Sequence, residues 1–338
     1  MAVRNATIPT LTDVVTGLNP NGTQADIAEI LTQDNPMLED AAVKEGNLVT
    51  GNRITVRTSK PTVGWRRLNQ GVPSSKGTSS QVDEASALLE GRHQVDRELA
   101  ILSGNPAEYR WAQGRPFIES MNDEAAETIF YGNSNFNDTE FTGLAPRFNE
   151  LANSQVIDGG GTGTDNRSIW LIGWHPEKVS LIYPKGTTGG LNHFDATANK
   201  AIGEDGFPIG DEVADEDGNT YMAYKDRWIW RLGLSVEDPR FVVRIANIDV
   251  SLLSKDASTG ADIQDLMIQA EDKIKSLQGV NAAFYVPGQV SSMLRRQLVT
   301  QKSAYMNWGQ IGGKQVTMFG ETPVRRADAL NVDEDRVV

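Results

Sequence analysis

Apolar residues recur at helical spacing in two long stretches of the chain. Over residues 114–131 they return every three or four positions while acidic side chains occupy the other side, which predicts a long amphipathic helix with Pro116 in its first turn. Residues 261–278 repeat the pattern more cleanly, with Asp262 able to cap the first turn and Gly279 able to end the helix. The sequence therefore predicts two substantial helices, each with one buried face.

Alternating apolar and polar residues indicate strands in the second half of the chain. Residues 228–249 alternate twice, before and after the turn-forming residues 237–239. We interpret this stretch as two strands paired with each other, with one face apolar and the other mostly solvated. Residues 168–174 form an almost continuous apolar run, which predicts a strand buried on both faces. A further buried strand is expected at 282–286 and a helix at 288–301.

The first hundred residues are less apolar. Residues 1–22 suit an extended arm, and a short helix is expected to begin at Thr23 and to end near Asn35. From residue 51 to about 100, sparse alternation on either side of a Gly/Ser-rich loop predicts a long, weakly buried, two-stranded excursion. Because such a ribbon is marginal on its own, it needs a partner surface to hold it.

Turn-forming residues mark three further features. Asp217-Gly218 predicts a hairpin tip before a following strand. The glycine-rich stretch 158–165 is expected to be a hinge or surface loop and a domain boundary. Residues 316–326 are expected to form a strand that turns near Pro323.

Composition limits the partners that the chain can bind. The 338 residues carry a net charge of −13 with a pI near 4.8, which disfavours direct binding of a phosphate backbone. No cysteine occurs, so disulfides and thiolate metal sites are excluded. Neither a secretory signal nor a run of about 18 apolar residues is present, and we expect a soluble chain with no membrane partner.

The residues that could carry chemistry form no recognisable set. His93, His175 and His193 lack partners at metal-ligand spacing, and each is better interpreted as a core or surface histidine. The acidic stretch 211–219 departs from the spacing of a calcium-binding EF-hand loop and is interpreted as a solvated hairpin tip. The glycine cluster lacks the ending of a nucleotide-binding loop. We therefore expect no catalytic residue, no cofactor site and no metal site.

One basic cluster stands out in this acidic chain. Trp65, Arg66 and Arg67 are adjacent within the predicted excursion. They could stack on bases or bind phosphate, but we favour docking onto an acidic neighbouring subunit. In that interpretation Trp65 anchors the contact and the two arginines pair with carboxylates. These three residues are the candidate inter-subunit contacts.

Four short motifs resemble those of the major capsid proteins of tailed bacteriophages. They are Gly233-Leu-Ser-Val-Glu-Asp-Pro-Arg240, Arg244-Ile-Ala-Asn-Ile-Asp249, Phe141-Thr-Gly-Leu144 and Gly320-Glu-Thr-Pro-Val-Arg325. The order of the predicted elements is also similar to that family. The resemblance implies an α+β chain with the tailed-phage major capsid protein fold: an N-terminal arm, an extended β-loop, a peripheral domain with a long spine helix, and an α/β axial domain.

The resemblance also implies domain limits. Residues 1–50 would form the N-terminal arm and a short helix, and residues 51–103 the extended loop. Residues 104–164 and 306–338 would form the peripheral domain with the spine helix. Residues 165–305 would form the axial domain.

The function implied by the resemblance is structural. The chain would assemble into hexamers and pentamers of an icosahedral shell around double-stranded DNA, in the virion, after synthesis in the host cytoplasm. Its partners would be copies of itself, a separate scaffolding protein, a portal, optionally a cementing protein, and packaged DNA bound without sequence specificity. The alternatives are a tail-tube or decoration subunit, or a hydrolase that uses carboxylates in residues 204–217, Asp215 and Asp217 among them, as acid and base.

Overall fold

The computed structural model describes residues 35–215, 217–274, 276–301, 306–311 and 314–338. The predicted N-terminal arm and almost all of the helix expected to begin at Thr23 lie outside the described residues. The chain divides into two compact units. Unit 1 takes in Leu88–Ala125 and Gly190–Trp230, and unit 2 takes in Gln33–Ala87, Ala126–Gly189 and Arg231–Val338. We describe each unit by itself.

A mixed sheet forms the centre of unit 2. Among the described residues its strands, in order across the sheet, are β12 (Met306–Ile311), β13 (Lys314–Phe319), β14 (Thr322–Arg326), β11 (Asn281–Val286), β5 (Asn166–Trp174), β10 (Val242–Asp249) and β4 (Val156–Asp158). The β11–β14 and β10–β4 pairs are parallel, and the other pairs are antiparallel. Strand β5 is buried from Ser168 to Trp174, which confirms the predicted strand with two buried faces.

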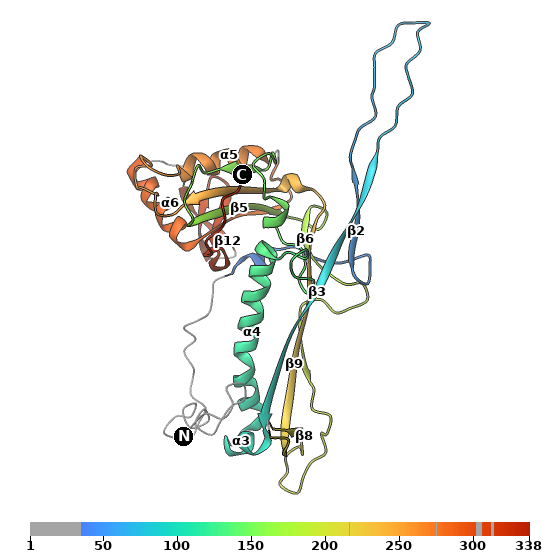
Figure 1. The fold of residues 1–338 in the computed structure, drawn as a ribbon, viewed down its shortest axis with the longest axis vertical. Coiled ribbons are helices and arrows are strands. Elements are labelled where there is room, and N and C mark those ends of the chain that lie inside the picture. The colour runs from blue at the N-terminus through green and yellow to red at the C-terminus, as the bar shows by residue number, and fades with distance from the viewer. Residues whose placement is uncertain (1–34, 216, 275, 302–305, 312–313) are drawn as a thin grey trace. The chain divides into compact units, whose positions relative to one another are not determined.

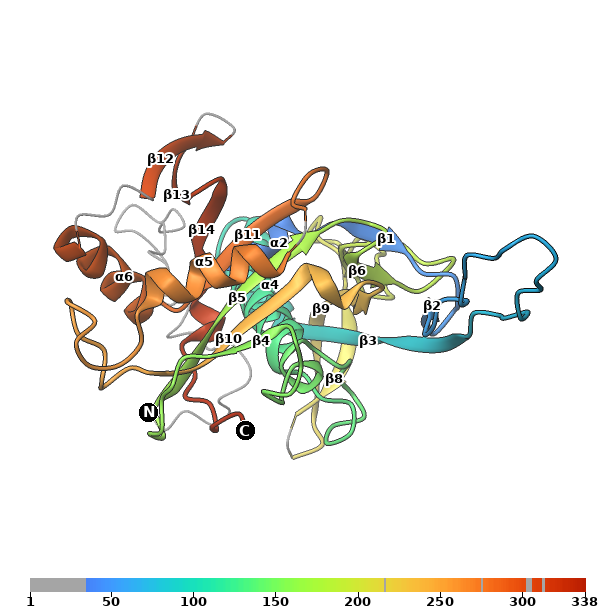
Figure 2. The ribbon, with the colours of Figure 1, turned by 90° about the horizontal axis from the view of Figure 1, so that it is seen from above.

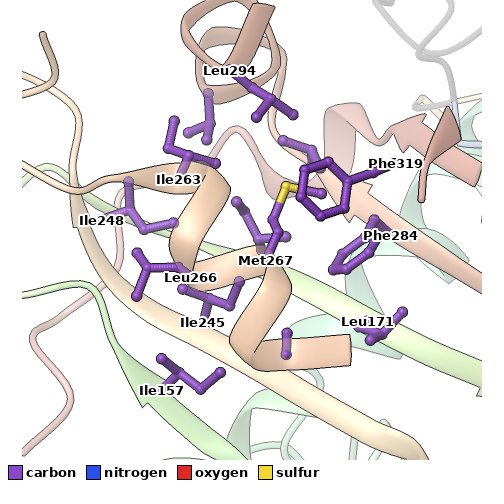
Figure 3. Packing of buried hydrophobic residues seen from close by; sticks show 14 of the residues in the cluster. Ile157, Leu171, Ile245, Ile248, Ile263, Leu266, Met267, Phe284, Leu294 and Phe319 are labelled. Carbon is purple, nitrogen blue, oxygen red and sulfur yellow. The ribbon is translucent and has the colours of Figure 1, made fainter. Parts of the chain in front are cut away.

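Two helices pack on one face of this sheet. They are α5 (Ile263–Lys273) and α6 (Gly288–Gln301), and Figure 2 shows α5 lying along β10. Met267 of α5 lies among Leu171, Phe284 and Phe319 of the strands (Figure 3). Each such buried apolar side chain contributes roughly 1.5–3 kcal/mol of transfer free energy. The predicted apolar stripe of α5 is therefore confirmed as the face that builds this core.

The other face of the same sheet is covered by aromatic residues. Phe130, near the end of α4 (Pro106–Tyr131), lies 6.1 Å from Trp170 and 6.3 Å from Tyr285 between ring centroids. Phe148 meets Trp170 edge-on at 6.0 Å. Because Trp170 and Leu171 point to opposite faces of β5, the strand is buried on both sides.

A second sheet contains the remaining strands of the described residues. Its order is β1 (Val43–Glu45), β6 (Val179–Tyr183), β9 (Thr220–Val236), β3 (Ser79–Asp96) and β2 (Gly51–Arg57), while β7 (Leu191–Asp195) and β8 (Asp211–Ala214) also pair with β9. The β8–β9 hairpin confirms the predicted tip at Asp217-Gly218, where Gly218 has a φ of 84°. Strands β2 and β3 are antiparallel and confirm the predicted two-stranded ribbon, with the chain between them continuing as a long open loop (Figure 1).

The prediction that residues 228–249 form two strands paired with each other is wrong. Strand β9 pairs with β6, β3, β7 and β8, whereas β10 pairs with β5 and β4 in the other sheet. Between them lies the short 3-10 turn η2 (Pro239–Phe241), in which the Asp238 side chain accepts from the Arg240 amide at 3.2 Å. Ser235, on the face expected to be solvated, is completely buried. Alternation gives the period of a strand but not the identity of its neighbour.

Three predicted boundaries also shift. Helix α4 begins at Pro106 rather than at residue 114, so Pro116 lies inside the helix instead of in its first turn. Helix α5 ends at Lys273 rather than near 278. The turn expected near Pro323 falls at Gly320, whose φ is 58°, and Pro323 lies within β14, paired with Met318.

The glycine-rich stretch is held against strand β10. The amides of Gly159 and Gly161 donate to the carbonyls of Ala246 and Asn247, each at 2.8 Å. A Cβ at Gly161 would lie 2.5 Å from the Asn247 carbonyl oxygen. These glycines therefore allow close backbone approach, and the stretch is not a free linker.

The remaining short elements join these layers. They are α2 (Met37–Asp40), α3 (Arg97–Leu102), η1 (Ala145–Arg147) and η3 (Asp328–Leu330). Within the part of the chain that the structure describes, no helix has the length and apolar character needed to span a membrane.

Candidate interaction surfaces

The segment between β2 and β3 is the most exposed part of the described chain. Every residue from 57 to 83, which we call the excursion, is solvent-exposed. Val63, Trp65 and Leu68 have relative exposures of 88%, 106% and 93%. Three large apolar side chains in one short stretch are thus left in water by the single chain.

Polar contacts hold the base of the excursion. Arg53 donates two hydrogen bonds to Asp83, both at 2.6 Å, and this pairing lowers the pKa of Asp83. The hydroxyls of Thr58 and Thr78 lie 2.8 Å apart where the ladder ends. Beyond that point the strands separate, so the loop keeps its course mainly through local contacts.

The predicted contact residues lie in the exposed loop. Arg66 donates to the Gln70 carbonyl at 3.3 Å, and Asn69 has a left-handed φ of 63° that turns the chain back. The structure brings Trp65, Arg66 and Arg67 no partner beyond this local turn among the contacts of the described residues. The excursion carries five basic residues and one acidic residue, against a net charge of −13 for the chain.

A buried ion pair fixes the root of the excursion, and no sequence pattern predicts it. Arg147 donates to both carboxylate oxygens of Glu84 at 2.6 Å, and Glu84 is only 6% exposed. The same guanidinium donates to the carbonyls of Thr142 and Gly143. The Phe141-Thr-Gly-Leu144 motif therefore positions the cation that holds β3. The two ion-pair partners are 63 residues apart, too far for local pattern to reveal them.

The Arg244–Asp249 motif also has a structural task. Arg244 donates to Glu334 at 2.7 Å and to the Phe148 carbonyl at 2.8 Å, and Glu334 also accepts from Tyr131 at 2.7 Å. Asn247, with a φ of 56°, exchanges two hydrogen bonds with the backbone of Val337 at 2.9 and 2.8 Å. The motif thus ties the last residues of the chain to β10.

Unit 1 contains a small hollow with an ionic hub in its wall. Asp226 is 4% exposed and accepts from Arg110 at 2.8 and 3.0 Å, with His193 Nε2 at 3.0 Å and His93 Nδ1 at 3.6 Å. Burial alone would raise the pKa of Asp226, but these histidine and arginine contacts lower it. The ring of Phe117 stacks on Trp228 at 5.5 Å. His93 is a core histidine, as expected.

The hollow measures about 210 Å³. It is lined by Ala107, Arg110, Trp111, His193, Asp195, Asp226 and Trp228. Trp111, at the edge of the hollow, is 54% exposed, and the side chain of Asp195 is 36% exposed. The hollow therefore combines aromatic walls with an accessible carboxylate.

At the acidic hairpin tip, the carboxylate of Asp215 stabilises the turn. Asp215 accepts from the amides of Asn219 at 2.8 Å and Asp217 at 3.0 Å, and the amide of Asn219 is the main cause of its lowered pKa. No group of three or more histidines or carboxylates in the described ranges could hold a metal ion. His175 accepts from the Glu177 amide at 3.1 Å in a similar local turn.

Comparison with known families identifies the chain. A family model described as "Major capsid protein GP7" matches residues 19–338. The chain belongs to the major capsid protein GP7 family. The match confirms the resemblance drawn from the four sequence motifs. A search among curated proteins found no match.

Solved structures agree with the GP7 assignment. A chain in the structure of bacteriophage Epsilon15 is 29% identical, with a TM-score of 0.76 and complete coverage of both chains. A chain of the bacteriophage JBD30 capsid is 13% identical, with a TM-score of 0.51, 96% of this chain covered and 100% of that one, and shows likeness of fold alone. These findings confirm the predicted α+β fold of tailed-phage major capsid proteins. The GP7 chain is therefore a structural capsid protein of the phage virion, rather than a tail-tube or decoration subunit.

Proposed function

We propose that this capsid protein assembles into hexamers and pentamers of an icosahedral shell enclosing double-stranded DNA. The observation that carries the proposal is the excursion, in which no residue from 57 to 83 is buried. Burying a large apolar side chain contributes roughly 1.5–3 kcal/mol, so Val63, Trp65 and Leu68 together favour association strongly. Lying on a sister copy would order the excursion and make stability depend on assembly.

The contact residues of this proposal are Trp65, Arg66 and Arg67. An exposed tryptophan beside two arginines is the composition that dominates binding energy at protein interfaces. The two guanidinium groups suit carboxylates on an acidic neighbour. A base-stacking role is less favoured because the chain as a whole is strongly acidic.

We assign the domains of the family fold to the ranges expected from the sequence. Residues 1–50 would be the arm with its short helix, 51–103 the extended loop, 104–164 with 306–338 the peripheral domain, and 165–305 the axial domain. Helix α4, the longest described helix, supports a spine role within the peripheral domain. Strands β5, β10 and β11 with α5 and α6 support an α/β axial domain.

The partners follow from the same proposal. Copies of the chain would form the shell in the host cytoplasm, with a separate scaffolding protein and a portal, and with a cementing protein as an optional addition. The net charge of −13 supports packaged DNA that is enclosed without sequence-specific contacts. We assign the chain no catalytic role, since the Asp215 carboxylate accepts from the amides of Asp217 and Asn219 within its own hairpin turn.

Electron microscopy and analytical ultracentrifugation of the full-length chain, with and without its scaffolding partner, test the proposal. We expect closed shells with five-fold vertices. Trp65→Ala should suppress assembly and leave the melting temperature of the monomer unchanged, because Trp65 makes no buried contact there. Phe136→Ala is the matched control, since Phe136 is 91% exposed on another surface. Open tubes with six-fold rings alone, or a stable monomer under every assembly condition, would overturn the proposal.

A further inference from the structure

We propose that the hollow of unit 1 is the receptor for the excursion of a second copy, with Trp65 seated in the hollow against Trp111 and His193. This inference rests on the proposed function and names the surface on which Trp65, Arg66 and Arg67 dock. We call the excursion the donor and the hollow the receptor. Three observations carry the inference: the exposure of the donor, the size and lining of the receptor, and the charges of the two surfaces.

The donor is an apolar wedge on a long open segment. Trp65 has its whole side chain in water, and Val63 and Leu68 flank it at 88% and 93% exposure. A tryptophan buries about 150–250 Å² when it enters a pocket, more than any other single side chain in the excursion can offer. The receptor must therefore be an aromatic or apolar hollow that holds one large ring.

The receptor has that size and lining. Its volume of about 210 Å³ is below the ~300–1,000 Å³ typical of sites for drug-sized molecules, so it suits one side chain better than a metabolite. Trp228 forms a buried wall, and His193 lies against it with ring centroids 5.0 Å apart. Trp111 stands at the edge, 6.3 Å from His193, and is half-exposed. An indole seated in the hollow would find edge and face contacts on the aromatic rings that line it.

The half-exposed ring of Trp111 adds apolar surface at the rim that a single chain leaves in water. Ala107 lies on the rim with a side chain small enough to leave the entrance open. Val63 and Leu68 of the excursion are suited to cover such a rim once Trp65 is seated.

The charges of donor and receptor are opposite. The excursion has a net charge of +4, with five basic residues and one acidic. Residues 88–125 and 190–230, the ranges of unit 1 that the structure describes, contain sixteen acidic and seven basic residues. Asp195 accepts from Arg110 at 2.9 Å, and its side chain remains 36% exposed. Arg66 or Arg67 could therefore pair with this carboxylate beside the seated ring.

Two single-cysteine variants test the contact, because the natural chain has no cysteine. Gly64→Cys places a thiol beside Trp65 and leaves Trp65, Arg66 and Arg67 unchanged. Nothing lies within 4 Å of a Cβ built at Gly64. Ala107→Cys places the second thiol on the rim. The two full-length variants are mixed, assembled and oxidised, and disulfide-linked dimers are resolved on a non-reducing gel. Gly64→Cys mixed with Phe136→Cys is the control for unspecific oxidation.

We expect linked dimers from the Gly64→Cys and Ala107→Cys mixture, in assembled particles but not in the unassembled chains, and at most a trace in the control. Shells that form normally without the 64–107 disulfide, or with equal linkage in the control, would overturn the receptor assignment and leave the proposed shell function intact. Absence of any particles, with unmodified protein as well, would count against the proposed function itself.

As a second measurement, Ala107→Phe should fill the hollow and raise the critical concentration for assembly at least about tenfold. An unchanged critical concentration would contradict the inference.

Discussion

Glycine at position 143 is required by neighbouring backbone. A Cβ there would lie 2.6 Å from the Thr128 carbonyl oxygen and 2.8 Å from that of Ile129, at the end of α4. Backbone atoms cannot move aside as a flexible side chain can, so the Phe141-Thr-Gly-Leu144 motif tolerates no larger residue at this point. The glycine of this family-like motif is therefore required by close packing against the end of α4.

Replacing Gly143 tests this packing. Gly143→Ala should lower the free energy of unfolding by about 1–3 kcal/mol, because overpacking forces the helix end and the motif apart. Thermal or denaturant unfolding of the purified chain measures it. Gly71→Ala is the control, since nothing lies within 4 Å of its Cβ position, and it should leave stability unchanged within about 0.5 kcal/mol. Equal stability of the two variants would contradict the expected clash.

The charged hub at Asp226 predicts acid sensitivity. The folded state lowers the pKa of Asp226, so its stabilisation is present above about pH 4, the pKa of an unfolded aspartate, and is lost as the pH falls through the folded pKa. Asp226→Asn should destabilise the chain by about 3 kcal/mol near neutral pH, because Arg110 loses its buried carboxylate partner and keeps only the more exposed Asp195. Melting temperatures from pH 7 to pH 2 should therefore fall less steeply for this variant than for the natural chain. Asp217→Asn, on the exposed hairpin tip, should leave the acid limb unchanged.

At the scale of the elements, the sequence predicted what local periodicity encodes. The stripe of α5 and the apolar run of β5 are confirmed because each is a property of consecutive residues. The pairing of β9 and β10 was predicted wrongly, because alternation does not say which strand lies alongside. Helix α4 begins earlier than predicted because Pro116, interpreted as a start signal, is accommodated within the helix.

The link between β3 and η1 is an element-scale contact that the sequence did not predict. Arg147→Ala should leave the buried Glu84 without a partner and destabilise the chain by about 3 kcal/mol. Hydrogen exchange should accelerate first at the amides of β3 and β2 that flank residue 84, because the ion pair fixes the root of the ribbon. Arg240→Ala, which removes an exposed arginine paired with nearby Asp238, is the control and should leave this exchange unchanged. Faster exchange throughout unit 2, with no preference for the ribbon, would show that Arg147 acts on the whole core.

For the whole molecule, the family could be predicted from short motifs, whereas the receptor hollow could not. Trp65, Arg66 and Arg67 are adjacent in the sequence, so their exposure and charge could be anticipated. The hollow draws Trp111, His193 and Trp228 from three separate elements, and only the fold brings them together. A contact surface made of adjacent residues in one loop can therefore be predicted from the sequence. A surface formed by residues of distant elements cannot.

The opposite charges of the excursion and of unit 1 predict that assembly depends on salt. Exposed charges are screened within about 8 Å at physiological ionic strength and within about 3 Å at 1 M, so the initial rate of assembly should fall as salt is raised. Light scattering from about 0.05 M to 0.5 M NaCl measures the rate.

Arg66→Gln with Arg67→Gln should slow assembly at low salt and flatten the salt dependence, because the excursion then loses two of its five cations. Arg295→Gln with Arg296→Gln removes another exposed arginine pair, from α6, and should preserve the salt dependence of the natural chain. Apolar burial strengthens as salt rises, so an assembly rate that increases with NaCl in all three proteins would show that Trp65 acts without help from its neighbouring arginines.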